Sequence, residues 1–181
     1  MSIKNILAGR TTLINNRSSP ILIVAGEPNV KKTFVSIAMS PIEPILYASF
    51  SPKDLSSHKD WLSRYNLEVF VIPATKINTV SIKEFIKEVD RGTLILDDFS
   101  FLPFMRQCEV VEELLAKSSK NLNFTLVSHI CALPDKTGRR YLSLALPTKL
   151  LPLDKYIVDW AFISPGKIRM LGYREVKCFL S

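Results

Sequence analysis

Short apolar runs rich in β-branched residues alternate with helix-like segments along most of this chain. Strands of this kind, buried on both faces, are typical of parallel sheets whose crossover connections are helices. The alternation therefore predicts an α/β fold with a twisted, mostly parallel sheet flanked by helices. The expected strands are Ile21–Ala25, Ile45–Phe50, Val69–Ile72, Thr93–Leu96 and Phe124–Ser128, and the expected helices are Lys32–Met39, Pro52–Tyr65, Ser81–Val89 and Arg106–Ser119.

The last part of the chain has a different pattern. Val158–Ile163 and Lys167–Leu171 have the composition of strands, and Ser164-Pro165-Gly166 joins them. Pro-Gly is a strong turn signal, so we expect a C-terminal β-hairpin at the edge of the sheet. No internal repeat or interdomain linker is evident in the 181 residues, so we expect residues 1–181 to form a single domain.

Composition limits the setting more than the function. The formal net charge of +7 agrees equally with an acidic partner, such as nucleic acid or a nucleotide, and with ordinary solubility. The three cysteines, Cys108, Cys131 and Cys178, have the spacing of neither a disulfide framework nor a zinc site, which favours a cytoplasmic, intracellular setting. No apolar run approaches about 20 residues, so we expect no membrane span, and no signal peptide is evident.

A candidate phosphate-binding loop follows the first strand. The segment Gly26-Glu27-Pro28-Asn29-Val30-Lys31-Lys32-Thr33 lies between an apolar strand and a helix-like run. The pattern of such loops is G-x-x-x-x-G-K-[ST], in which backbone N–H groups and a lysine surround the phosphates. This segment has the first glycine, the lysine (Lys32) and the hydroxyl (Thr33), but Lys31 replaces the second glycine. It is therefore a degenerate Walker A motif.

A second motif completes the candidate nucleotide site. The apolar run Thr93-Leu94-Ile95-Leu96 ends in Asp97, two crossover units after the loop. Ligands of open parallel sheets bind beyond the carboxyl ends of the strands, so Asp97 is expected beside the phosphate loop. This is the Walker B arrangement, in which Thr33 and Asp97 hold Mg²⁺, the carboxylate directly or through water.

These motifs resemble those of the RecA-like ATPases, particularly the KaiC/RadA branch. The resemblance implies a RecA-like sheet, ATP or ADP bound with Mg²⁺ at subunit interfaces, homo- or hetero-oligomers of RecA-like subunits, and frequently DNA recombination or repair. It also implies that Arg174 acts in trans on a neighbouring site. The segments that carry the resemblance are Gly26–Pro28 with Lys32-Thr33, Leu46–Phe50, Leu94–Asp97, Thr125–His129 and Val158–Ile163.

Three departures from the family pattern predict weak or absent hydrolysis. The family carries a catalytic glutamate just after the second strand, where this chain has Ser51 and Pro52. Lys31 adds a Cβ and a cation where glycine lets the backbone approach the phosphates; it either pairs with a phosphate or obstructs the loop. Gly172 stands where the family often has a lysine two residues before the arginine, which weakens the trans-acting role of Arg174.

Two further residues are candidates for catalysis. In DNA-pumping motors of the FtsK/HerA type, the residue after the Walker B aspartate is usually a catalytic glutamate, and Asp98 occupies that position here. The interpretation that we favour for Asp98 is a solvated or helix-capping aspartate. His129 follows Ser128 at the end of the next strand, where such folds place a polar sensor of the γ-phosphate; it is equally a polar strand end.

A basic cluster follows that strand and is a candidate nucleic-acid contact. Lys136, Arg139 and Arg140 surround Gly138, and Tyr141 is adjacent. In RecA-like proteins this region is often a mobile loop that touches single-stranded DNA, and cations with an aromatic neighbour suit phosphate contacts and base stacking. An ordinary solvated hairpin loop is the alternative.

The sequence therefore leads to one principal hypothesis and two alternatives. The principal hypothesis is a RecA/KaiC-like paralogue that binds ATP or ADP with Mg²⁺, hydrolyses it slowly, and acts in DNA recombination or repair or regulates an active partner. The first alternative is a non-catalytic RecA-fold scaffold subunit of a larger complex, similar to the accessory subunits of Elongator. The second is a viral or plasmid DNA-packaging-type ATPase that uses Asp98.

Overall fold

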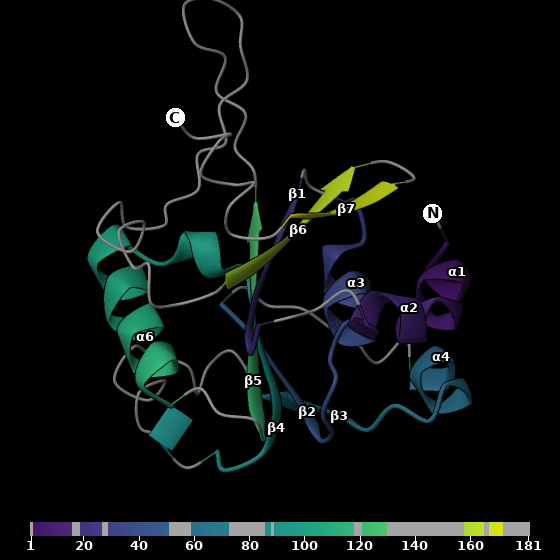
Figure 1. The fold of residues 1–181 in the computed structure, drawn as a ribbon, viewed down its shortest axis with the longest axis horizontal. Coiled ribbons are helices and arrows are strands. Elements are labelled where there is room, and N and C mark those ends of the chain that lie inside the picture. The colour runs from purple at the N-terminus through teal and green to yellow at the C-terminus, as the bar shows by residue number, and fades with distance from the viewer. Residues whose placement is uncertain are drawn as a thin grey trace, which may run out of the picture.

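The fold is built on one seven-stranded sheet with the strand order β3-β2-β4-β5-β1-β6-β7 (Figure 1). The structure is a computed structural model that describes residues 2–15, 19–26, 29–50, 59–72, 86–87, 89–117, 121–129, 158–164 and 167–171. All neighbouring strands are parallel except β6 and β7, which are antiparallel. The strands are β1 (Ile21–Gly26), β2 (Ile45–Ser49), β3 (Val69–Ile72), β4 (Gly92–Asp97), β5 (Leu122–His129), β6 (Val158–Ser164) and β7 (Lys167–Leu171).

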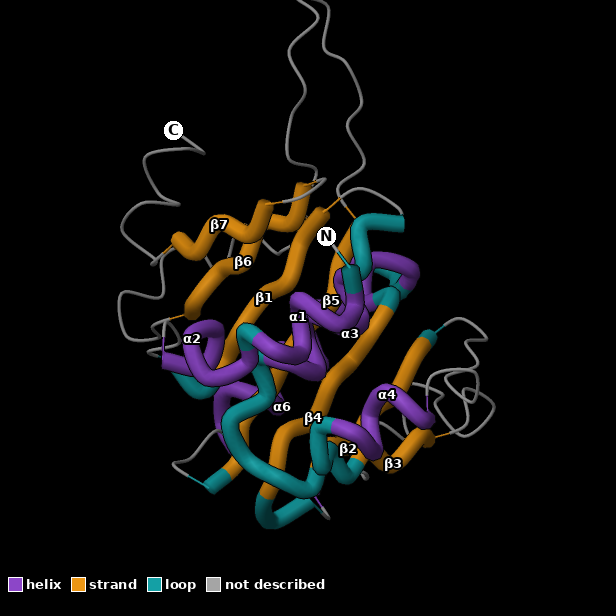
Figure 2. The backbone as a smooth tube through the Cα atoms, turned by 90° about the vertical axis from the view of Figure 1, so that its right-hand side faces the viewer, coloured by secondary structure: helices purple, strands orange, loops and turns teal. Residues whose placement is uncertain are grey.

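Helices cover both faces of this sheet. Figures 1 and 2 show α1, α2, α3 and α4 on one face of the sheet and the longer helix α6 on the other. Those on the first face are α1 (Ile3–Ala8), α2 (Arg10–Asn15), α3 (Lys32–Ala38) and α4 (Lys59–Arg64). The opposite face carries the short 3₁₀ helix η3 (Phe99–Phe101) and α6 (Phe104–Lys117). The α/β class and the mostly parallel sheet predicted from the sequence are thus confirmed, and so is the antiparallel edge hairpin.

The direction of the connections explains this division. The chain passes from β1 to β2 toward the β3 edge and from β4 to β5 toward the β7 edge. Parallel crossovers are right-handed, so opposite directions place their helices on opposite faces. Side chains of α3 therefore pack in one core with Leu22 and Val24, whereas those of α6 pack in a second core with Ile21 and Ile23. Because the strands are parallel, the carboxyl ends of β1, β4 and β5 meet at one edge.

Some predicted boundaries need correction. The sequence analysis did not predict α1 and α2, although Ser2 accepts a hydrogen bond from the Asn5 backbone N–H and so caps α1. The helix predicted over Arg106–Ser119 begins and ends two residues earlier, because Pro103 supplies its start. Within the predicted helices Pro52–Tyr65 and Ser81–Val89, residues 52–58, 81–85 and 88 lie outside the described residues. Among the described residues, no helix is both long and apolar enough to span a membrane.

Candidate functional site

The candidate loop has the strand–loop–helix geometry that the sequence predicts. Strand β1 ends at Gly26 and helix α3 begins at Lys32; Glu27 and Pro28 lie between them, outside the described residues. Asn29 and Lys31 both adopt left-handed backbone conformations, with φ of 65° and 69°. Glycine adopts this conformation without steric cost, whereas a residue with a Cβ pays about 1–2 kcal/mol. Lys31, which stands where the pattern has glycine, therefore holds a glycine-like backbone at an energetic cost.

The first glycine of the loop is required by packing. A Cβ built on Gly26 would lie 2.5 Å from the Ile163 carbonyl oxygen of the neighbouring strand β6. The same Cβ would lie 3.0 Å from a methyl group of Val30. A carbonyl oxygen in a strand cannot move away as a flexible side chain can, so only glycine fits here without shifting the backbone. Gly26 thus joins the close packing of the sheet to the start of the loop.

Lys32 is folded back over the loop. Its side chain is buried, with 6% exposure, and its Nζ donates a hydrogen bond of 2.9 Å to the Gly26 carbonyl oxygen. A buried ammonium needs such a partner because its desolvation is costly. The contact brings the charge of Lys32 to the first residue of the loop. A cation at this point can neutralise phosphate groups bound by the loop.

Thr33 and Asp97 are brought into direct contact. The Thr33 hydroxyl donates a hydrogen bond of 2.7 Å to Oδ2 of Asp97, across 64 residues of sequence. The Asp97 carboxylate is fully buried, and its Oδ1 accepts a hydrogen bond of 2.7 Å from the Asp98 backbone N–H. Helix α3 positions Thr33 and the end of β4 positions Asp97, so the two predicted metal-binding residues meet at the carboxyl edge of the sheet.

This pair fits Mg²⁺ bound together with a nucleotide. A threonine hydroxyl that donates its proton keeps lone pairs for a metal ion. Mg²⁺ is usually held by one or two carboxylates, substrate phosphates and water, and less often by an all-protein cage. Within the described part of the chain, no group of three His, Cys, Asp or Glu side chains could form such a cage. A magnesium ion here would therefore depend on phosphate oxygens for part of its coordination.

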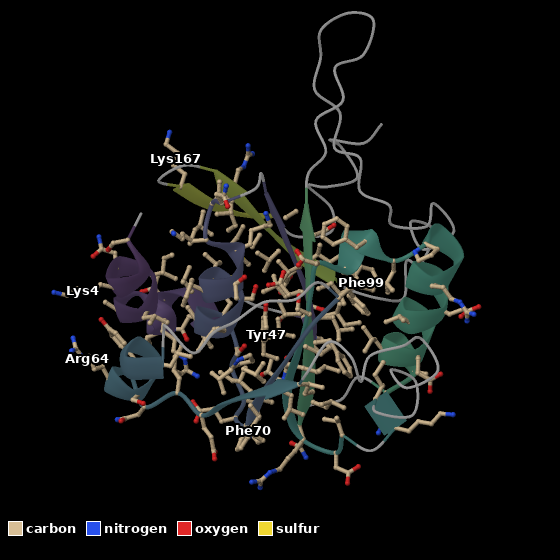
Figure 3. All side chains as sticks on the ribbon, turned by 180° about the vertical axis from the view of Figure 1, so that it is seen from behind. Lys4, Tyr47, Arg64, Phe70, Phe99 and Lys167 are labelled. Carbon is tan, nitrogen blue, oxygen red and sulfur yellow. The ribbon has the colours of Figure 1, made fainter. Side chains whose placement is uncertain are left out.

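Tyr47 is a third member of this cluster, and the sequence analysis did not single it out. Its hydroxyl donates a hydrogen bond of 2.6 Å to the same Asp97 oxygen that accepts from Thr33. Figure 3 shows Tyr47 in the interior of the molecule. Burial raises the pKa of Tyr47, and the nearby Asp97 charge and hydrogen bond raise it further, against smaller opposing effects of Ser49 and Thr33. Tyr47 is thus a neutral hydrogen-bond donor at physiological pH.

Asp98 is buried at the start of η3. It is 1% exposed, so the prediction of a solvated aspartate is wrong. Asp98 does occupy the N-cap position of η3, as the capping interpretation has it, but its side chain makes no capping hydrogen bond to that helix. Instead, Asp98 has a left-handed backbone with φ of 58°, and the Ser49 hydroxyl donates a hydrogen bond of 3.3 Å to its Oδ2. Because Ser49 is the last residue of β2, this contact places a buried carboxylate at the carboxyl end of that strand.

The remaining predicted residues divide into two groups. Ser128 and His129 end β5, which lies between β1 and β4, and His129 pairs with Gly26 in the sheet register. Their backbone therefore lies at the edge where a sensor of the γ-phosphate was expected. Other positions named from the sequence lie outside the described residues. They are Ser51, where the family has its glutamate, the nucleic-acid candidates Lys136, Arg139 and Arg140, and the trans-acting candidate Arg174.

The sequence contained a weak signal for the residues that were missed. Tyr47 and Ser49 are two positions apart on β2, so their side chains lie on the same face of the strand. In the sheet, Ser49 pairs with Asp97 and Tyr47 pairs with Ile95. Polar groups near the end of one strand beside an acid at the end of another indicate a shared cluster. Only the strand order, with β2 next to β4, shows that these two strands are neighbours.

Comparisons with known proteins add no family assignment. No protein-family model and no curated protein sequence matches this chain. Functional interpretation therefore depends on the motifs and on the geometry of the cluster around Asp97.

Proposed function

We propose that this chain is a RecA/KaiC-like protein that binds ATP or ADP with Mg²⁺. The observation that carries the proposal is the 2.7 Å hydrogen bond from Thr33 to Asp97. In a nucleotide site of this kind, the hydroxyl of the loop and the strand-end carboxylate share one metal ion. A chance pair of motifs has no reason to bring these two side chains together at the edge where ligands of parallel sheets bind.

Each residue of the cluster has a distinct task in this proposal. The loop backbone from Gly26 to Thr33 surrounds the phosphates, and Lys32 neutralises their charge. Thr33 ligates Mg²⁺ with its hydroxyl oxygen, and Asp97 stands behind it as hydrogen-bond acceptor and negative charge. The metal ion supplies charge neutralisation across the phosphate groups. The family resemblance alone supports two further parts of the proposal. One is assembly into oligomers of RecA-like subunits, and the other is a role in DNA recombination or repair or in regulating an active partner.

Slow hydrolysis is part of the same proposal. A positioned general base contributes typically 10²- to 10⁴-fold to rate, and Ser51 occupies the position of the family's glutamate. Asp98 is a candidate substitute, because the Ser49 hydroxyl at the end of β2 donates a hydrogen bond to its carboxylate. A small residual activity would then depend on Asp98.

Calorimetric titration with ATP and Mg²⁺ tests nucleotide binding. We expect micromolar binding to the wild-type protein and its loss in Lys32→Ala, because that variant removes the buried cation of the loop. Lys4→Ala is the matched control, since Lys4 is exposed on α1, outside the loop (Figure 3). Equal affinities of all three proteins would contradict a phosphate-binding role for Lys32.

Hydrolysis is tested with two variants of opposite expected effect. Asp98→Asn removes the proposed substitute base, so we expect residual turnover to fall at least tenfold. Ser51→Glu restores the family's carboxylate, so we expect turnover to rise. If DNA strongly stimulates turnover and Asp98→Asn abolishes it, the chain is a packaging-type motor. If Ser51→Glu leaves turnover unchanged, the missing base is assigned to the wrong position.

A non-catalytic scaffold is the second candidate, and the conformation of Lys31 favours it. Lys31 occupies the left-handed position at the start of α3 with an exposed side chain, so a Cβ and a long chain lie where the pattern has none. A loop that no longer binds phosphate would tolerate this residue. Absence of detectable nucleotide binding, in wild-type protein shown to be folded by its cooperative thermal unfolding, would favour the scaffold.

A further inference from the structure

The sheet register explains how the hydroxyl of Tyr47 contacts Asp97 at the candidate magnesium site. Tyr47 pairs with Ile95 in the sheet, and Asp97 lies two residues further along β4. Two residues of strand span roughly 6.6 Å, about the length of a tyrosine side chain. The ring therefore runs along the sheet beneath α3, with its body in the apolar core and its hydroxyl at the carboxyl edge. The side chain is 1% exposed.

We propose that Tyr47 is a positioning residue that orients the Asp97 carboxylate for magnesium binding by Thr33. This inference rests on the proposed nucleotide-binding function. It concerns a residue on β2, outside both the loop motif and the strand-end motif. The observation that carries it is the convergence of two hydroxyl donors, from Tyr47 and Thr33, on one oxygen of a buried carboxylate.

Three donors from three parts of the chain fix this carboxylate. Oδ2 accepts from Thr33 at 2.7 Å and from Tyr47 at 2.6 Å, and Oδ1 accepts from the Asp98 backbone N–H at 2.7 Å. A carboxylate has about four acceptor positions, so at least three of them are used. Rotation of the carboxylate would break at least one of these bonds. With Asp97 fixed, the Thr33 proton is committed to it, and the lone pairs of the threonine oxygen remain for the metal ion.

Removal of the Tyr47 hydroxyl should lower the affinity for Mg²⁺ without leaving a cavity in the hydrophobic core. Tyr47→Phe keeps the ring and removes one of the two hydroxyl donors, Tyr47 and Thr33, that meet on Oδ2, so the carboxylate is held less firmly. Partners that orient metal-binding groups typically contribute 10- to 100-fold to metal affinity. The loop backbone and Lys32, which contact phosphate, are unchanged in this variant. The expected loss is therefore confined to the magnesium-dependent part of nucleotide affinity.

The test compares ATP affinity with Mg²⁺ and with excess EDTA in three proteins: wild type, Tyr47→Phe and Tyr65→Phe. Tyr65 is the matched control because its hydroxyl donates to the Lys4 carbonyl oxygen at 3.3 Å in an exposed position. We expect the enhancement of ATP affinity by Mg²⁺ to fall about tenfold in Tyr47→Phe. Affinity for metal-free ATP should be the same in all three proteins, which also shows that each is folded.

Two results would overturn the inference. If Mg²⁺ enhances the ATP affinity of Tyr47→Phe to within about twofold of its effect on wild type, Tyr47 is only a packing residue. If Mg²⁺ enhances the affinity of this variant more than that of wild type, the Tyr47 hydroxyl competes with the metal ion. Failure of wild type to bind ATP under either condition would instead contradict the proposed function itself.

A second measurement does not require the phenylalanine variant to fold. Replacement of the five tyrosines with 3-fluorotyrosine gives ¹⁹F signals, and the signal of position 47 is assigned by elimination with Tyr→Phe variants at the other four positions. We expect the signal of position 47 to shift when Mg²⁺ joins the ATP complex, because the carboxylate it contacts then faces a new cation. No shift at position 47, in protein that binds Mg²⁺ and ATP, would overturn the inference.

Discussion

At the scale of single residues, the backbone of Lys31 stores energy that glycine would release. Its φ of 69° and ψ of 28° lie in the left-handed region, where a Cβ costs about 1–2 kcal/mol. Glycine lacks that steric cost but loses more conformational entropy on folding, which costs roughly 0.5–1 kcal/mol. The steric cost of lysine is the larger of the two, so glycine is favoured at this position. The lysine at this position thus lowers stability, and it adds a second cation next to Lys32.

We predict that Lys31→Gly raises the free energy of unfolding by about 0.5–1 kcal/mol, the difference between these two terms. Urea unfolding without nucleotide measures it. Lys31→Ala is the matched control, because it removes the same charge but keeps the Cβ in the left-handed conformation. A gain of equal size in both variants would show that charge repulsion with Lys32, and not backbone strain, lowers the stability of the wild type.

Prediction from sequence was most successful for residues whose motif carries a spacing. The contact between Thr33 and Asp97 follows from a loop after one strand and an acid at the end of another. The environment of Asp98 did not follow, because burial depends on how η3 and β2 close around it. Tyr47 was missed for a related reason: a tyrosine in an apolar strand has the same local pattern whether its hydroxyl meets a carboxylate or a backbone group.

At the scale of elements, β1 and β6 approach closely at Gly26. A Cβ at this position would lie 2.5 Å from the Ile163 carbonyl oxygen, a contact that real side chains do not make. The two strands pair in parallel along six residues, and Gly26 is the last of them. Any relief must therefore come from a shift of β6 or of the loop that follows β1.

We predict that Gly26→Ala lowers the free energy of unfolding by about 1–3 kcal/mol, the usual cost of overpacking a well-packed site. Gly9→Ala is the control, because a Cβ there would meet its nearest atoms at 3.4 and 3.6 Å, which is ordinary contact. We expect Gly9→Ala to be neutral or slightly stabilising, since its φ of −84° is open to alanine. Thermal and urea unfolding of both variants provide the comparison, and equal losses would contradict the steric explanation.

Strands were predicted more closely than helices, for a physical reason. The bounds of every described strand differ from prediction by at most two residues. The central strands β1 and β4 are buried along their whole length, so their apolar runs are nearly continuous and easy to recognise. Helices α1 and α2 have six residues each, too few for a helical period to stand out. They are stabilised by packing: Ile6 and Leu7 of α1 are buried in the core that α3 also lines. Such tertiary stabilisation is not visible in local sequence.

At the scale of the whole molecule, the strand order decides which chain segments share the candidate site. Placement of β5 between β1 and β4 brings Gly26, His129 and Asp97 to one edge from three distant segments. The sequence predicts the parallel sheet but not this order, because every apolar strand is an acceptable neighbour for every other. Right-handed crossovers reduce the possible arrangements without selecting one.

Net charge is the property of the whole molecule that bears on nucleic-acid binding. The net charge is +7, and the basic cluster of Lys136, Arg139 and Arg140 supplies three of the 24 lysines and arginines. A cluster that contacts single-stranded DNA releases counterions at each phosphate, so affinity falls with salt at a slope of about 0.7 per contact. If DNA is instead attracted by the overall positive charge of the molecule, the dependence of affinity on salt should change equally whichever cations are removed.

We predict that replacing Lys136, Arg139 and Arg140 with alanine lowers the salt slope of single-stranded DNA binding by about 2, the sum of three phosphate contacts. The matched control removes three exposed cations elsewhere, Lys4, Arg64 and Lys167, so that both variants carry the same net charge (Figure 3). Fluorescence anisotropy of a labelled oligonucleotide, repeated at several salt concentrations, measures the slope. If the basic cluster contacts DNA directly, the salt slope of the control variant should stay near that of the wild type, because Lys4, Arg64 and Lys167 lie elsewhere in the sequence. Equal slopes in the two variants would show that the attraction comes from overall charge, and the cluster would then be an ordinary solvated loop.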